Sequence, residues 1–267
     1  MASVSRPRHA LALLTQLRRL PPQVALFQWR ARGLAARTGD EFGPLSATRA
    51  RDLRTLLDLA HGRRSVVELG TGSAWTAISL ALADPRRTVV TYDPIDRPER
   101  ARYLALVGSS VRGRVTLVAA EGREGPREQS AVDLLYIDSA HDEQGTIGEV
   151  EAWRASLAEG ALIVFDDYTH PEYPGVRRAV ERLGLRGERR GTLFVHRVGE
   201  RAGLVEAAPV AQTDLASGAG PRPGRANTAA ARQPPAASAS ASQGHQPPGG
   251  AHEACGRNQV GPEVPTA

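Results

Sequence analysis

The sequence has a single cysteine, no lysine and no long apolar run. Because Cys255 stands alone, an internal disulfide is excluded and a reducing compartment is expected. The apolar run near the N-terminus, residues 10–14, is too short to cross a membrane, and no convincing cleavage site accompanies it. Together these absences predict a cytoplasmic protein that does not enter a membrane.

The basic residues are all arginine or histidine, a choice that coding bias explains more simply than function. The net charge of +5 suggests nucleic acid as a partner, but the excess is local. Residues 1–61 carry ten arginines against four acids, whereas residues 62–199 carry nineteen against twenty. No RNA-binding motif or basic patch interleaved with aromatic residues accompanies the N-terminal excess, so nucleic acid is not the expected partner.

Three regions differ in composition. Residues 200–267 are rich in Ala, Pro, Ser, Gly and Gln, which predicts a disordered low-complexity tail. Residues 1–61 have the periodicity of helices at 9–20, 23–37 and 47–61, the last with Ser46 as its N-cap, and form a predicted helical cap. These helices either cover the main domain, line its active site or form a homo-oligomer contact.

The middle region, residues 62–199, alternates strands with helices. Strands are expected at 65–69, 88–92, 114–118, 132–137, 161–165 and 192–198, with a weaker edge strand at 186–190. Helices are expected between them at 74–83, 98–109, 145–157 and 175–183. This alternation predicts an α/β fold: a Rossmann-like, doubly wound, mostly parallel sheet with helices on both faces.

The stretch VVELGTGSAWTAISLALA, residues 66–83, is predicted to form a strand, a tight turn and a helix. Gly70 and Gly72 allow the backbone to turn sharply, and the helix that follows presents unpaired N–H groups to an anion. Ala74 and Trp75 depart from the dinucleotide fingerprint, which makes NAD the weaker candidate. Alone, the turn is also compatible with a glycine-rich connection that binds nothing.

Acidic residues follow the predicted strands. Asp93 follows the second strand, where a carboxylate is placed to accept hydrogen bonds from ribose hydroxyls. Asp138 follows the fourth strand, and Asp166 and Asp167 follow the fifth, so the three carboxylates can converge on one point. A divalent cation such as Mg²⁺ would satisfy them together. Alternatively, Asp166 or Asp167 caps a turn or pairs with a nearby arginine, and Asp138 contacts the cofactor amine.

Four motifs in order, ELGTGSAW, TYDP, YIDSAH and LIVFDDY followed by PGVRRAV, resemble class I S-adenosylmethionine-dependent methyltransferases, particularly the small-molecule O-methyltransferases of family-24 type. The resemblance covers roughly residues 53–198. It implies that the methionine end of the cofactor is held by Glu68, Gly70, Gly72 and Ser73, that Asp93 holds the ribose and that Glu121 lies near the adenine. It also supports Asp138, Asp166 and Asp167 as the ligands of the cation.

His141 stands three residues after Asp138, an offset at which the metal-dependent relatives carry a base. A neutral imidazole can take a proton from a hydroxyl near pH 7, so His141 is the expected catalytic base. A loop histidine without a catalytic role is the alternative, and His170 is a second candidate. Tyr168 and Trp75 are candidates to line the substrate pocket or simply to pack.

The sequence therefore predicts an S-adenosylmethionine-dependent O-methyltransferase, assisted by Mg²⁺ or a similar cation, that acts on a small hydroxylated molecule. One alternative is a metal-independent N-, C- or RNA methyltransferase, and another is a non-catalytic cofactor-binding or scaffold protein. No motif identifies the acceptor.

Overall fold

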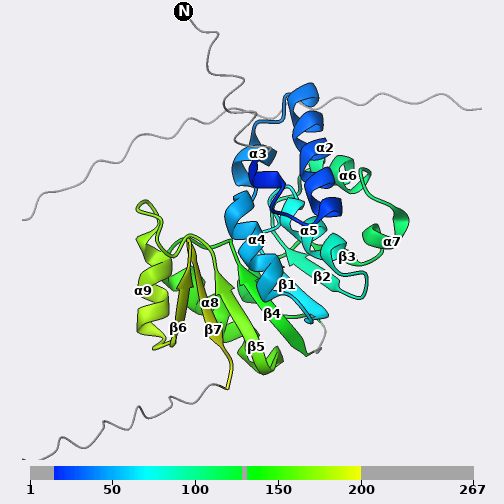
Figure 1. The fold of residues 1–267 in the computed structure, drawn as a ribbon. Helices are drawn as coiled ribbons and strands as arrows, with labels where there is room; N and C mark the ends of the chain where they lie inside the picture. Colours follow the sequence, from blue (N-terminus) through cyan, green and yellow to red (C-terminus); the bar gives the residue numbers. More distant parts are fainter. Residues whose placement is uncertain (1–14, 128–130, 200–267) are drawn as a thin grey trace, which may run out of the picture. The chain divides into compact units, whose positions relative to one another are not determined.

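The computed structural model of the chain describes residues 15–127 and 131–199 (Figure 1). The first part of the predicted helix at 9–20 and the whole predicted tail, residues 200–267, lie outside the described residues. The division of the chain into a cap, a methyltransferase domain and a tail therefore stays a prediction.

A seven-stranded sheet forms the centre of the described part, in the order β3-β2-β1-β4-β5-β7-β6. Its strands are β1 (Ser65–Leu69), β2 (Thr88–Tyr92), β3 (Val115–Val118), β4 (Val132–Ile137), β5 (Leu157–Phe165), β6 (Gly187–Arg190) and β7 (Leu193–Arg197). The pairs from β3 to β5 are parallel, and β7 runs antiparallel to both of its neighbours. The predicted α/β fold with a mostly parallel sheet is confirmed.

Helices cover both faces of the sheet (Figure 1). One face packs against α4 (Ala50–Leu59) and α5 (Trp75–Ala83), which bury Leu53, Leu56 and Leu80 with residues of β1, β4 and β5. The other face packs against α8 (Glu143–Trp153) and α9 (Pro174–Arg182). The central strands β1, β4 and β5 are mostly buried for this reason, as is typical of parallel sheets.

Helix α2 (Pro22–Thr38) packs on α5 rather than on the sheet. Phe27 and Ala31 are buried against Trp75 and Ile78. The outer side of α2 leaves Leu26 and Trp29 exposed, and the prediction of a homo-oligomer through the N-terminal helices remains untested.

Several predicted helix boundaries are wrong for local reasons. Ser46 does not cap α4; it ends the short helix α3 (Phe42–Ser46), and α4 begins after Arg49. The predicted helix at 98–109 is two helices, α6 (Glu99–Leu104) and α7 (Ser109–Arg112), with Gly108 between them in extended conformation. Helix α8 begins earlier than predicted because the Asp142 side chain accepts a hydrogen bond from the Gly145 N–H. The short 3₁₀ segments are η1 (Gly122–Glu124) and η2 (Arg154–Ser156).

Arg87 is a buried arginine, 1% exposed, that ties together the amino-terminal side of the sheet. Its guanidinium donates hydrogen bonds to the carbonyl oxygens of Arg63 (3.0 Å), Leu80 (2.8 Å) and Ala60. Burial lowers the pKa of Arg87, with the nearby Asp84 opposing this effect. The guanidinium therefore supplies donors to carbonyls at the ends of helices and in loops.

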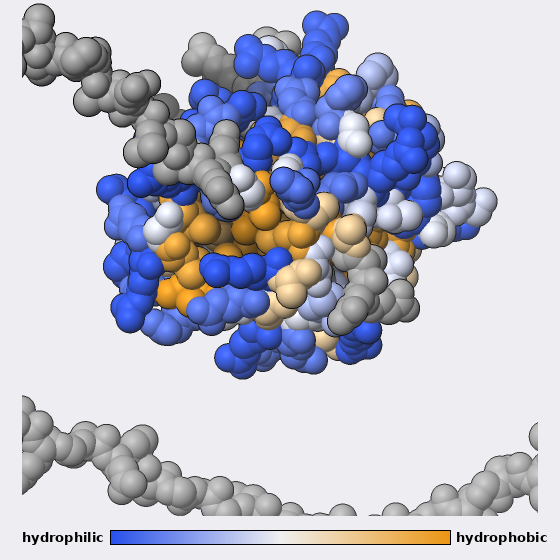
Figure 2. Space-filling view, turned by 90° about the horizontal axis from the view of Figure 1, so that it is seen from below, coloured by the Kyte–Doolittle hydropathy of each residue, from blue (hydrophilic) through white to orange (hydrophobic). Residues whose placement is uncertain are grey.

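Figure 2 views the molecule from the end of the sheet at which β7 ends, and hydrophobic side chains gather there in a band bordered by hydrophilic ones. Because β7 is antiparallel to β5, this is the amino end of the parallel strands. Within the described residues, no helix is long and apolar enough to cross a membrane.

Candidate active site

A cavity of about 710 Å³ opens at the carboxyl ends of the parallel strands. Its walls come from the loops after β1, β2, β4 and β5, from η1 and from residues 42–52. The strand order reverses between β1 and β4, which is where open α/β sheets bind their ligands. The cavity therefore stands at the position that the fold favours for a cofactor.

The glycine-rich turn lines this cavity through Gly70 and Gly72. Gly70 has a φ of 97°, and a Cβ there would lie 2.1 Å from the carbonyl oxygen of Asp138, so only glycine fits. Ala74 also has a left-handed φ, 66°, and α5 begins one residue later, at Trp75. The turn thus extends further than predicted before the helix begins.

Asp93 lines the cavity beside this turn and is held by hydrogen bonds. Its Oδ2 accepts from the Gly72 N–H (3.0 Å) and from Nη2 of Arg100 (2.6 Å), while its Oδ1 accepts from the Ile95 N–H (2.8 Å). Arg100 also donates to the Gly72 carbonyl (2.8 Å). Sequence reasoning missed Arg100, which fixes both the predicted ribose acid and the turn.

The other predicted cofactor residues differ in their access to the cavity. Glu121 lines it, whereas Glu68 and Ser73 are buried behind the turn. The Oε2 atom of Glu68 accepts a hydrogen bond from Thr91 (2.5 Å), whose hydroxyl also lies 2.7 Å from that of Thr71. Burial raises the pKa of Glu68 to about 8, although Thr91 and Arg100 oppose the shift. Glu68 is therefore linked through the Thr91 hydroxyl to Thr71 of the glycine-rich turn.

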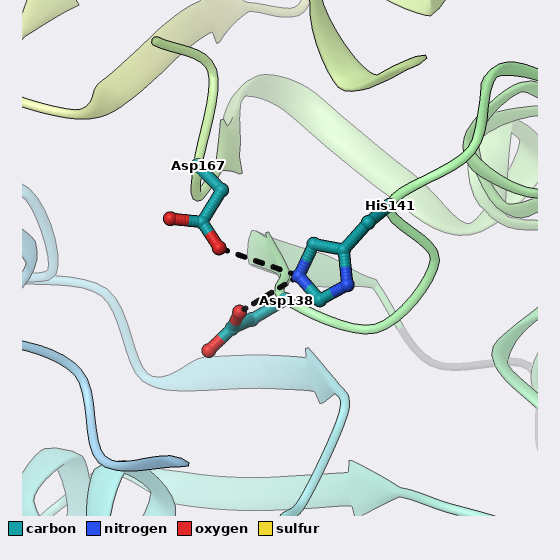
Figure 3. Close-up of side chains that lie close together, drawn as sticks. All are labelled: Asp138, His141 and Asp167. Carbon is teal, nitrogen blue, oxygen red and sulfur yellow. Dashed lines mark ion pairs between the residues drawn. The ribbon is translucent and has the colours of Figure 1, made fainter. Parts of the chain in front are cut away.

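Asp138, His141 and Asp167 come together in the cavity (Figure 3). His141 Nε2 lies 3.4 Å from Asp167 Oδ2 and 3.9 Å from Asp138 Oδ1. The left-handed φ of Asp167, 52°, turns its carboxylate toward His141 as the chain leaves β5. One ligand atom from each residue lies within 4.8 Å of the others, a grouping that a metal ion can occupy.

The predicted third carboxylate, Asp166, does not belong to this group. Its Oδ2 accepts a hydrogen bond from the Tyr136 hydroxyl (2.5 Å), and its Oδ1 accepts from Thr192 (3.2 Å) and from the Asp167 N–H (2.7 Å). Tyr136 is fully buried on β4, the strand next to β5. The structure therefore brings together two of the three predicted carboxylates and replaces the third by His141.

The two carboxylates of the group have opposite pKa shifts. Burial raises the pKa of Asp138 well above its ordinary value, and the charges of Asp166 and Asp167 add to the effect. Burial opposes ionisation of Asp167, but the hydrogen bond of His141 and the charges of His141, His170 and Arg49 together lower the pKa of Asp167. A bound cation would lower the free-energy cost of ionising Asp138.

Aromatic rings cover the group on the side of the β5–α9 loop. The Tyr173 ring stacks on His141 with a centroid separation of 4.1 Å and on His170 at 4.6 Å. His170, the second candidate base, thus lies beyond Tyr173 and not between the carboxylates. Tyr168 stacks on Phe194 and Trp75 is 1% exposed among Phe27 and Tyr103, so both pack and neither lines the cavity.

Residues 67–168 match the sequence profile of the methyltransferase-domain family Methyltransf_24. The match begins in β1 and ends just after the Asp166–Asp167 pair, so it contains the glycine-rich turn and all three residues of the group in Figure 3. No curated protein matches the chain.

Solved structures resemble the chain at low sequence identity, and the first two named here share its fold. A protein described as a putative caffeoyl-CoA O-methyltransferase from Staphylococcus aureus superposes with a TM-score of 0.50 at 14% identity, over 63% of this chain and 90% of that chain. Cofactor-bound Rv0187 from MTB gives 0.50 at 24% identity, over 63% and 88%. CalS11, a TDP-rhamnose 3'-O-methyltransferase, gives 0.45 at 19% identity, over 56% and 80%.

Proposed function

Because the chain carries a class I S-adenosylmethionine-dependent methyltransferase domain of the methyltransferase-24 family, we propose that it methylates a hydroxyl group of a small molecule with the help of a divalent cation. The observation that carries this proposal is the position of Asp138, His141 and Asp167. They lie in the same cavity as Gly70 and Gly72 of the glycine-rich turn.

The residues present fit a divalent cation. One carboxylate oxygen each of Asp138 and Asp167 lies within 4.8 Å of the other and of an imidazole nitrogen of His141. Carboxylate oxygens are ligands that hard divalent cations prefer, so an ion held by the two carboxylates would have the imidazole beside it. Asp138 is partly buried close to other acids and has no cationic partner among the described residues except His141. Asp138 and Asp167 would hold the ion, which when bound lowers the pKa of a hydroxyl that it contacts.

In this proposal, His141 takes the proton from the acceptor hydroxyl. Its imidazole is partly exposed to the cavity, and Asp167 orients it from one side. Asp93, fixed by Arg100, holds the ribose of the cofactor, and the glycine turn lets the methionine end approach the backbone. Methyl transfer between bound partners needs little further covalent help, so alignment supplies most of the acceleration.

The test measures S-adenosylhomocysteine release with a panel of phenols, catechols and sugars, with Mg²⁺ or Mn²⁺ and after chelation. We expect turnover only in the presence of the cation. His141→Gln should lower turnover by about 100-fold or more while the affinity for Mn²⁺, measured by calorimetry, changes little. Full turnover of the metal-stripped enzyme would refute the role of the cation, and loss of Mn²⁺ binding in His141→Gln would make His141 a ligand instead of the base.

Asp166 and Asp167 provide a further comparison. Because Asp166 is held by Tyr136 and Thr192, Asp166→Asn should weaken Mn²⁺ binding less than Asp167→Asn does. Equal loss in the two variants would favour the three-carboxylate site that the sequence suggests.

A further inference from the structure

We propose that Tyr173 is a positioning residue for His141, holding the imidazole over the two carboxylates. The inference rests on the proposed function, because it gives a purpose to the orientation of the base. It starts from the stack of three rings in which Tyr173 contacts His141 at 4.1 Å with an interplanar angle of 23° and His170 at 4.6 Å with 24°.

The backbone places Tyr173 at this point. A Cβ on Gly175 would lie 2.5 Å from the carbonyl oxygen of His141 and 2.6 Å from the Cα of Asp142, so the start of α9 touches the loop that carries His141. Pro174 opens α9, and the Tyr173 N–H donates to the His170 carbonyl (3.1 Å). The two loops therefore meet without space between them, and Tyr173 has little freedom to leave.

A second contact, with Asp167, complements the stack of Tyr173 on His141. Its Nε2 faces Asp167 Oδ2 at 3.4 Å, while Tyr173 covers a ring face. A hydrogen bond fixes where one nitrogen points but permits rotation about that direction. A stacked ring opposes this rotation, so the pair of contacts defines the plane of the imidazole.

Ion pairs between α8 and α9 also help to hold Tyr173 beside His141. Arg178 and Arg182 on α9 both form ion pairs with Glu143 at the start of α8, at 3.1 and 3.3 Å. These pairs link α9, which follows Tyr173 in the chain, to α8, which follows His141. The ring, and not its hydroxyl, is the part that acts on His141.

The experiment compares Tyr173→Phe, which keeps the ring, with Tyr173→Leu, which removes it. Tyr168→Leu is the matched control, because Tyr168 lies on the same loop but stacks on Phe194. In the metal-free full-length protein, the NMR signal of the His141 Cε1 proton is assigned with His141→Gln. We expect the signal to keep its ring-current shift in Tyr173→Phe and Tyr168→Leu and to lose it in Tyr173→Leu.

Turnover with Mg²⁺ then tests the consequence. Tyr173→Leu should lower kcat by roughly 5-fold, the size expected of one aromatic contact, with the KM for S-adenosylmethionine unchanged and Tyr173→Phe within 2-fold of the natural protein. In the His141→Gln background, Tyr173→Leu should cause no further loss.

The proposal is refuted if Tyr173→Phe loses as much turnover as Tyr173→Leu, if the His141 signal does not move, or if the loss persists in the His141→Gln background. The last result would place Tyr173 against the acceptor itself. Failure of the proposed function looks different: His141→Gln would leave turnover unchanged while the ring-current shift of His141 remained.

Discussion

Replacing the buried Glu68 by glutamine should flatten the dependence of stability on pH. Glu68 is 1% exposed, and burial raises its pKa from 4.5 to about 8. The unfolded chain ionises this carboxyl above pH 4.5, whereas the folded protein retains the proton until about pH 8, so unfolding releases a proton in the interval between them. Stability from this group is therefore complete below pH 4.5 and is lost as the pH rises toward 8.

The magnitude follows from the two pKa values. At about 1.4 kcal/mol for each pH unit, the group costs the protein roughly 2.5 kcal/mol of unfolding free energy between pH 5 and pH 7. Glu68→Gln keeps an acceptor for Thr91, with which Glu68 makes its hydrogen bond, but cannot ionise. Between pH 5 and pH 7, the loss of unfolding free energy in the variant should therefore be smaller than in the natural protein by roughly 2.5 kcal/mol.

Urea denaturation of the cofactor-free protein at pH 5, 6 and 7 measures the effect. Acids that do not interact with Glu68 contribute equally to both proteins and cancel in the difference. The charge of Glu68 raises the pKa of Asp138, but Glu68 is protonated in the folded protein between pH 5 and pH 7, so this interaction contributes little there. Glu151→Gln, on the exposed side of α8, is the control and should follow the natural protein at every pH. If Glu68→Gln lost stability with pH as steeply as Glu151→Gln, the argument that Glu68 is held protonated by burial would be refuted.

Two further variants test the buried arginines. Arg100→Met leaves Asp93 without its cationic partner, and breaking a buried ion pair costs about 3 to 5 kcal/mol. The stability to urea and the calorimetric affinity for S-adenosylhomocysteine should therefore both fall. Arg102→Met, at an exposed position, should change neither. An unaltered affinity in Arg100→Met would show that the pair does not shape the cofactor turn. Arg87→Lys should cost about 2 to 4 kcal/mol, because a lysine amine leaves buried carbonyls unpaired; stability equal to that of the exposed Arg86→Lys would contradict this role.

The sheet was predictable because its strands follow simple physical rules. Strands β1, β2 and β4 begin and end where their runs of β-branched and aliphatic residues do. The start of α8 depends on a local cap, whereas the segment leading into α4 also makes contacts that are distant in the sequence. Thr48, near the expected start of α4, places its hydroxyl 2.8 Å from that of Thr76 and 3.1 Å from that of Tyr136, and no local pattern announces this.

The candidate site was predictable in its location but not in its details. Adjacent parallel strands bring their carboxyl ends together, which places Asp138 near Asp167 from topology alone. The direction of each carboxylate depends on single dihedral angles, such as the left-handed φ of Asp167, and on the Tyr136 hydroxyl that holds Asp166. Arg100 and Tyr173 act through contacts across loops, and their residue types alone did not distinguish them from surface residues.

The close contact at Gly175, in the first turn of α9, limits which positions near the cavity can be substituted. At Gly175, any added side chain would meet the backbone of His141 and Asp142. Residues 169–172 are exposed or partly exposed and precede that contact. If this cavity binds the acceptor, as proposed, substitutions and insertions confined to residues 169–172 would alter the wall that His170 forms and with it the choice of substrate, while the contact at Gly175 keeps the loop that carries His141 in place.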